Sequence, residues 1–129
     1  MKPEQFIREF GVEKAREILK IVPENEYYLT NVMIKPCGNW VYSQIAQLTH
    51  HDGVKFNVSF KLLEEWKPKF VNLKDLKRLV ESLDLINKCG GIDEVERIYL
   101  PIPAEFELKF ANLIQAIKDH ESIYGGRDE

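Results

Sequence analysis

The densest group of titratable side chains in this sequence is the run His50-His51-Asp52. Imidazole and carboxylate groups bind transition metals and transfer protons near neutral pH, so these three residues are the candidates for catalysis or a metal site. A metal would need further ligands, and neither Cys37 nor His120 stands at a supporting spacing. Adjacent strand residues also point to opposite faces, so both histidines cannot readily ligate one ion. We interpret the run as a polar hairpin tip and keep an enzyme acting through it as an alternative.

Other catalytic patterns are absent from the sequence. No serine stands in a Gly-x-Ser-x-Gly elbow, and the pair Gly90-Gly91 lies between two expected helices rather than in a phosphate-binding loop. Neighbouring carboxylates such as Glu64-Glu65 are typical of a solvated helix face. The sequence therefore predicts no catalytic residue, metal or cofactor, and it favours a non-enzymatic role.

One basic run is the feature that favours nucleic-acid binding. Its cations are Lys67, Lys69, Lys74, Lys77 and Arg78. Such groups hold phosphates, and the interleaved Trp66 and Phe70 are able to stack on bases. The formal net charge of −3 gives no general attraction to a polyanion, so binding would depend on this local patch. A nucleic-acid-associated protein is therefore the alternative function.

Aromatic residues gather in or beside the expected sheet. The set comprises Tyr27, Tyr28, Trp40 and Tyr42. Each taken singly is more often a core residue, but tyrosine and tryptophan also anchor protein interfaces, because they bury a large area at low entropic cost. We therefore take these four as candidates for contact with a protein partner. A small nucleotide held at a subunit interface would also suit them, and an open sheet edge would allow a homodimer.

Three successive parts of the chain must position these residues. Residues 1–22 predict two helices, 3–10 and 12–21, separated by Gly11. Residues 24–66 consist of short apolar runs bounded by proline and glycine, which predict three to four antiparallel strands between residues about 27 and 60. The segment 54–60 alternates strictly and follows the turn signal Asp52-Gly53, so it is expected to be the clearest strand, in a sheet with one wet face.

Residues 72–124 predict the helical C-terminal part. Asn72 is the expected N-cap of a long helix, with Asp75 three residues later, and Gly90-Gly91 ends that helix. Asp93 is expected to cap a short helix, and the last helix is expected to open at Pro103. Together the three parts predict one α+β domain over residues 1–129, with four to five short helices flanking a small antiparallel sheet.

Size and composition agree with an ordinary globular protein. The chain has 129 residues, of which 44% are hydrophobic and 30% charged. Its N-terminus lacks an apolar signal core, and no run approaches the roughly 20 apolar residues that a membrane span requires. The expected location is the cytoplasm.

Two segments carry a resemblance to known proteins. They read FIREFGVEKAREIL at residues 6–19 and VNLKDLKRLVES at residues 71–82, the latter followed by the glycine pair. Both resemble segments of small accessory proteins of tailed bacteriophages and prophages, and together they cover roughly a third of the chain. The resemblance implies a phage protein acting in the cytoplasm of a bacterial host, and it supplies no active-site residues. The resulting hypothesis is a non-enzymatic accessory protein that binds a host or phage protein, acting as an inhibitor or redirecting its partner.

Overall fold

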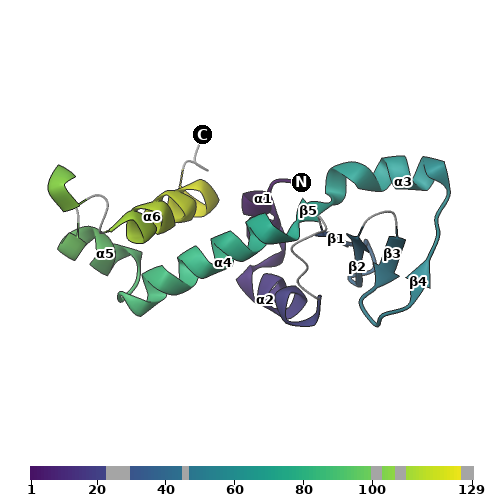
Figure 1. The fold of residues 1–129 in the computed structure, drawn as a ribbon, viewed down its shortest axis with the longest axis horizontal. Coiled ribbons are helices and arrows are strands. Elements are labelled where there is room, and N and C mark those ends of the chain that lie inside the picture. Colours follow the sequence, from purple (N-terminus) through teal and green to yellow (C-terminus); the bar gives the residue numbers. More distant parts are fainter. Residues whose placement is uncertain (23–29, 45–46, 100–102, 107–109, 126–129) are drawn as a thin grey trace. The chain divides into compact units, whose positions relative to one another are not determined.

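The computed structural model describes residues 1–22, 30–44, 47–99, 103–106 and 110–125 (Figure 1). The chain divides into two compact units, residues 1–77 and residues 78–129, and each is described by itself. The expectation of a single domain stays a prediction. Among the described residues, no helix is both long enough and apolar enough to cross a membrane.

Unit 1 begins with the two helices that the sequence predicts. Helix α1 (Pro3–Phe10) and helix α2 (Val12–Ile21) are joined by Gly11. Its φ is 89°, a backbone conformation that glycine adopts readily and other residues adopt rarely. The backbone N–H of Gly11 donates to the carbonyl of Ile7 at 2.9 Å and closes α1. The glycine thus ends one helix and begins the next within a single residue.

The sheet of unit 1 is antiparallel and confirms the predicted α+β class. Within the described residues it has five strands, where three to four were expected. Its strands are β1 (Thr30–Ile34), β2 (Trp40–Gln44), β3 (Gln47–His50), β4 (Lys55–Phe56) and β5 (Val71–Asn72), in the spatial order β4-β3-β2-β1-β5. The additional strand is β5, which pairs Val71 with Val32 and Asn72 with Asn31. Both edge strands span two residues, and short edges offer little backbone for pairing with another chain.

Both faces of this sheet carry buried side chains, so the prediction of one wet face is wrong. On one face, here called the α3 face, Met33, Val41 and Leu48 form a core cluster with Trp66. On the opposite face, the α2 face, Val32, Trp40 and Val71 are buried. Figure 1 shows helix α3 (Phe60–Trp66) on one side of the strands and α2 on the other. The sheet is therefore a middle layer between helices.

The segment 54–60, expected to be the clearest strand, is mostly not a strand. Only Lys55–Phe56 pairs with β3, and Phe60 already belongs to α3. The Ser59 hydroxyl accepts a hydrogen bond from the N–H of Leu62 at 3.1 Å, which caps α3. A helix cap inside the alternating pattern thus ends the strand early. The expected hairpin at Asp52-Gly53 is confirmed. The segment 40–48, whose composition favours a strand over a helix, forms strands at its described residues 40–44 and 47–48. The strand expected near residues 27–29 lies outside the described residues.

Helix α4 (Leu73–Lys88) begins in unit 1 and continues into unit 2. Its predicted start is confirmed, because the Asn72 Oδ1 accepts a hydrogen bond from the N–H of Asp75 at 3.1 Å. Its predicted end is also confirmed. The helix ends at Lys88, and Gly90 and Gly91, which begin two residues later, take φ values of 99° and 100°.

Two helix starts in unit 2 differ from their predictions. Helix α5 (Ile92–Tyr99) begins one residue before Asp93, since the N–H of Val95 donates to Gly91, which takes the capping position. Pro103 precedes a short 3₁₀ turn, η2 (Ala104–Phe106), and helix α6 (Ala111–Tyr124) begins later. Among the described residues of unit 2, Ile86, Val95, Leu113 and Ala116 form a buried core cluster.

Candidate functional site

The predicted aromatic interface is not a single exposed set. Tyr27 and Tyr28 lie outside the described residues. Trp40 is only 2% exposed and belongs to the core of unit 1, so its predicted role as a contact residue is corrected: a buried ring has almost no area to offer a partner. Tyr42 is half-buried, and its ring centroid lies 6.4 Å from that of Trp40 on the α2 face. Of the four candidates, Tyr42 alone is described and partly exposed.

Trp40 instead ties the sheet to α2. Its indole N–H donates to Glu17 Oε2 at 3.3 Å, and the Lys14 ammonium contacts the same oxygen at 3.0 Å. The hydrogen bond and the positive charge of Lys14 lower the pKa of the Glu17 carboxyl below its usual value, and the indole hydrogen bond acts in the same direction. Glu17 therefore stays ionised at neutral pH and joins helix to sheet.

The histidine run is divided between the two faces of its hairpin. The His50 ring stacks on Phe56 with centroids 4.2 Å apart and planes inclined by 24°. The His51 ring lies 5.9 Å from Trp40, which belongs to the opposite face. Asp52 Oδ1 accepts a hydrogen bond from the N–H of Val54 at 3.0 Å and so shapes the turn. Within the described part of the chain, no three metal-binding side chains come together.

The five predicted nucleic-acid residues do not form one free cationic set. Lys67, Lys69 and Lys74 are exposed, but the ammonium of Lys67 lies 3.5 Å from a carboxylate oxygen of Glu64. Lys77 is half-buried. Arg78 belongs to unit 2, where its guanidinium lies 3.6 Å from Asp119.

A groove in unit 1 gathers lysines that the sequence reading did not group. Its volume is about 520 Å³, and its apolar lining includes Phe10, Ile34 and Pro36. The lysines that line it come from three separate places in the fold: Lys14 from α2, Lys35 from the position directly after β1, and Lys69 from the 3₁₀ turn η1 (Lys67–Lys69). We call these residues the lysine groove. Glu9 is the one carboxylate among its described lining residues.

Local structure explains how the groove forms. The chain turns directly after β1, where the N–H of Gly38 donates to the carbonyl of Lys35 at 2.8 Å with φ of 94° at the glycine. On the other side, the Met1 amino group donates to the carbonyls of Pro68 and Phe70, both at 2.7 Å, and fixes the start of α1 beside η1. Phe10 is 37% exposed, with its ring 5.0 Å from that of the buried Phe6. The groove therefore presents ammonium groups around an accessible aromatic ring.

A buried carboxylate in unit 2 was also missed. Asp119 is 3% exposed, and its Oδ2 accepts a hydrogen bond from the hydroxyl of buried Ser82 at 2.6 Å. Its Oδ1 accepts from the amide of Gln115 at 3.0 Å. The bond from Ser82 joins α4 to α6, whereas the bond from Gln115 lies within α6. The sequence held a signal, because Ser82 and Asp119 fall at three-residue spacing from Leu79 and Ala116, within apolar helix faces.

Comparison with protein-family models, with curated proteins and with solved structures finds no match to this chain.

Proposed function

We propose that this chain is a non-enzymatic accessory protein that binds an acidic segment of a host or phage protein through the lysine groove. The observation that carries the proposal is the convergence of three lysines, from α2, from the turn after β1 and from η1, around an apolar groove. The chain as a whole is acidic, with a net charge of −3, so a local excess of ammonium groups must be assembled by the fold.

The chemistry of the groove defines the partner. Ammonium groups attract carboxylates and determine orientation, while Phe10, Ile34 and Pro36 provide apolar area for one or two hydrophobic side chains. A segment in which acidic and apolar residues alternate meets both requirements. Because Lys14 already contacts Glu17, Lys35 and Lys69 are the lysines assigned to the partner's carboxylates.

A direct binding measurement tests this assignment. The probe is a short fluorescein-labelled peptide in which aspartate and glutamate alternate with leucine and phenylalanine, followed by fluorescence anisotropy. The double variant Lys35→Glu with Lys69→Glu is expected to abolish binding. The matched control replaces Lys55 and Lys61, both exposed in unit 1 and outside the groove, by glutamate. Equal loss in both variants would show a general charge effect and would overturn the groove assignment.

Nucleic-acid binding is the second candidate, and the exposure of Lys67, Lys69 and Lys74 favours it. Affinity for oligothymidine would then fall with salt, with a slope of about −0.7 per phosphate contact. Glutamine at Lys67, Lys69, Lys74, Lys77 and Arg78 would remove it. Two results together would favour nucleic-acid binding: tighter binding of oligothymidine than of the acidic peptide, and loss of oligothymidine binding in the glutamine variant. The nucleic-acid hypothesis would then replace the protein-partner hypothesis.

The proposed cellular location follows from the resemblance of residues 6–19 and 71–82 to phage and prophage proteins. It places the protein in the cytoplasm of a bacterial host. Affinity capture from bacterial lysate, with nuclease added, is expected to retain one stoichiometric protein on the natural chain. The variant Lys35→Glu with Lys69→Glu should lose that protein, and the control variant at Lys55 and Lys61 should keep it. Retention by both variants would contradict the proposed site.

A further inference from the structure

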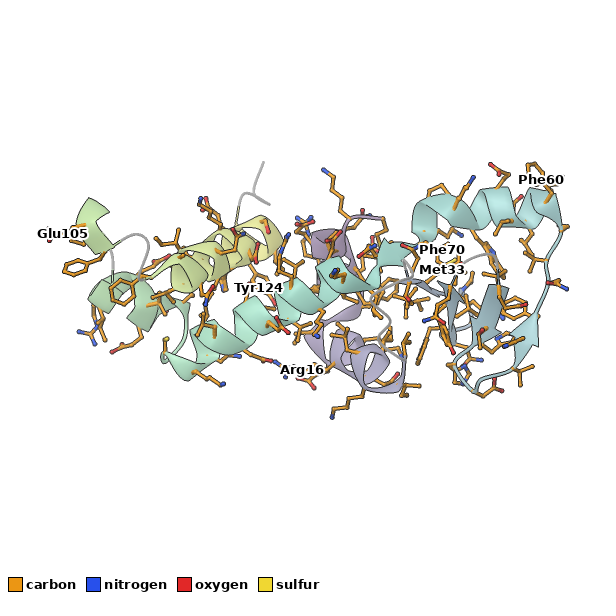
Figure 2. All side chains as sticks on the ribbon, in the orientation of Figure 1. Arg16, Met33, Phe60, Phe70, Glu105 and Tyr124 are labelled. Carbon is orange, nitrogen blue, oxygen red and sulfur yellow. The ribbon has the colours of Figure 1, made fainter. Side chains whose placement is uncertain are left out.

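A second cavity in unit 1 lies between the sheet and α3, and the proposed function does not use it. Its volume is about 540 Å³, within the range of small-molecule sites, and none of its lining residues belongs to the lysine groove. Figure 2 shows Met33 and Phe70 close together where the chain leaving α3 meets the sheet, and Phe70 lines the cavity. We call it the polar crevice.

The floor of the polar crevice is a row of side chains on three neighbouring strands. Leu48 on β3 pairs with Ser43 on β2, and Ser43 pairs with Asn31 on β1, so the three residues lie side by side. Directly opposite residues project from the same face of a sheet. The same face carries Met33 and Val41, which pack under Trp66. Along the row, Leu48 therefore belongs to the apolar core cluster, whereas Ser43 and Asn31 are polar and lie outside it.

The polar members of the crevice have unused hydrogen-bonding groups. The side chains of Asn31, Ser43 and Asn57 make no hydrogen bond to another residue in the described part of the chain, although Asn31 and Ser43 are half-buried. Two carboxamides and a hydroxyl offer both donors and acceptors. A ligand that enters the crevice finds these groups available and meets apolar surface on Val58, Leu63 and Phe70.

The charge of the lining indicates the sign of the ligand. Lys67 lines the crevice, and no carboxylate does so among its described lining residues. The ammonium of Lys67 lies 3.5 Å from Glu64, a long contact at a largely exposed position. An anionic group on a ligand would compete with Glu64 for this ammonium.

We propose that the polar crevice binds a small organic anion with a planar, hydrogen-bonding body. Its carboxylate or phosphate contacts Lys67, and its planar body packs against Leu63 and Phe70. Its amide or ring edge hydrogen-bonds to Asn31 and Ser43. This site is independent of the lysine groove, so either proposal can fail alone.

The test follows backbone amide shifts of the full-length ¹⁵N-labelled chain in NMR titrations with two anions. Hippurate carries a carboxylate, an amide and a phenyl ring, and adenosine monophosphate carries a phosphate and a heteroaromatic ring. The uncharged counterparts are hippuramide and adenosine. Saturable shifts at Asn31, Ser43 and Leu48 are expected. The anion is expected to bind about two- to fivefold more tightly than its uncharged counterpart, because the Lys67 ammonium is largely exposed. The anion that binds tells a carboxylate site from a phosphate site.

Two variants and one control complete the experiment. Lys67→Gln is expected to remove the preference for the anion, and Ser43→Ala to weaken both charged and uncharged ligands. Lys61→Gln, on the same helix but outside the crevice, should leave binding unchanged. The absence of saturable shifts with either anion up to about 10 mM would overturn the proposal. Equal affinities of the Lys67→Gln and Lys61→Gln variants would overturn it as well.

Discussion

The buried pair Ser82 and Asp119 allows a quantitative test of what joins α4 to α6. The hydroxyl–carboxylate bond is 2.6 Å long and buried, and a hydrogen bond to a charged group contributes about 1.5–3 kcal/mol. Ser82→Ala removes the donor and leaves the carboxylate with Gln115 at 3.0 Å and Arg78 at 3.6 Å. We therefore expect Ser82→Ala to lower the free energy of local opening of α4 and α6 by an amount in this range. Such a loss corresponds to amide exchange about tenfold to a hundredfold faster.

Native-state hydrogen exchange, measured by NMR on the backbone amides of α4 and α6, is the assay, because it reports local opening free energies without assuming one global transition. Asp119→Ala leaves the Ser82 hydroxyl buried without its acceptor, so the double variant should cost less than the sum of the two single variants. Ser122→Ala is the control, since that hydroxyl donates to the backbone carbonyl of Asp119 within one helix. If the loss of opening free energy in the double variant equals the sum of the losses in the two single variants within about 0.5 kcal/mol, the pair is not coupled and the reasoning is refuted.

Three further predictions concern single positions. Gly11→Ala should lower the free energy of unfolding by about 1–3 kcal/mol, because a Cβ at this position meets no other atom and the positive φ alone strains the alanine. Urea unfolding followed by tryptophan fluorescence measures this loss, and a value below about 0.5 kcal/mol would contradict the prediction. In a carboxyl NMR titration, the pKa of Glu17 should lie below the usual value of a glutamate, and Lys14→Gln should raise it. Any stability from this pair is present at neutral pH and is lost as the pH falls through the lowered pKa. Iodoacetamide should alkylate the exposed Cys37 faster than the half-buried Cys89, and equal rates would argue against this placement.

The local elements of the fold could be predicted because their signals lie within a few residues. Gly11 separates two helices, Asn72 caps α4 and Asp52-Gly53 closes a hairpin, and in each case the responsible bond joins near neighbours in the sequence. The early end of the strand at residues 54–60 had a local cause as well, the Ser59 cap. Strict alternation concealed that cap, since a serine suits both a strand and a helix start.

The candidate sites were less predictable, because they are made by residues far apart in the chain. Trp40 was expected at an interface, and its burial depends on α2 covering a sheet face that the sequence left open. The lysine groove unites residues 14, 35 and 69, which share no motif. The regular spacing of the basic run could be seen in the sequence. In the folded protein, however, Arg78 pairs with Asp119 and Lys67 with Glu64.

The sequence by itself determined the α+β class, the main helices and the turns, since glycine φ values, capping bonds and apolar periodicity act over a single turn or strand. Only the tertiary structure decided which sheet faces are covered, where β5 pairs, and which polar groups meet in the lysine groove and the polar crevice. Those outcomes depend on strand register and on helices packing across the sheet. Contacts of that kind bring together residues whose order along the chain carries no record of their proximity in space.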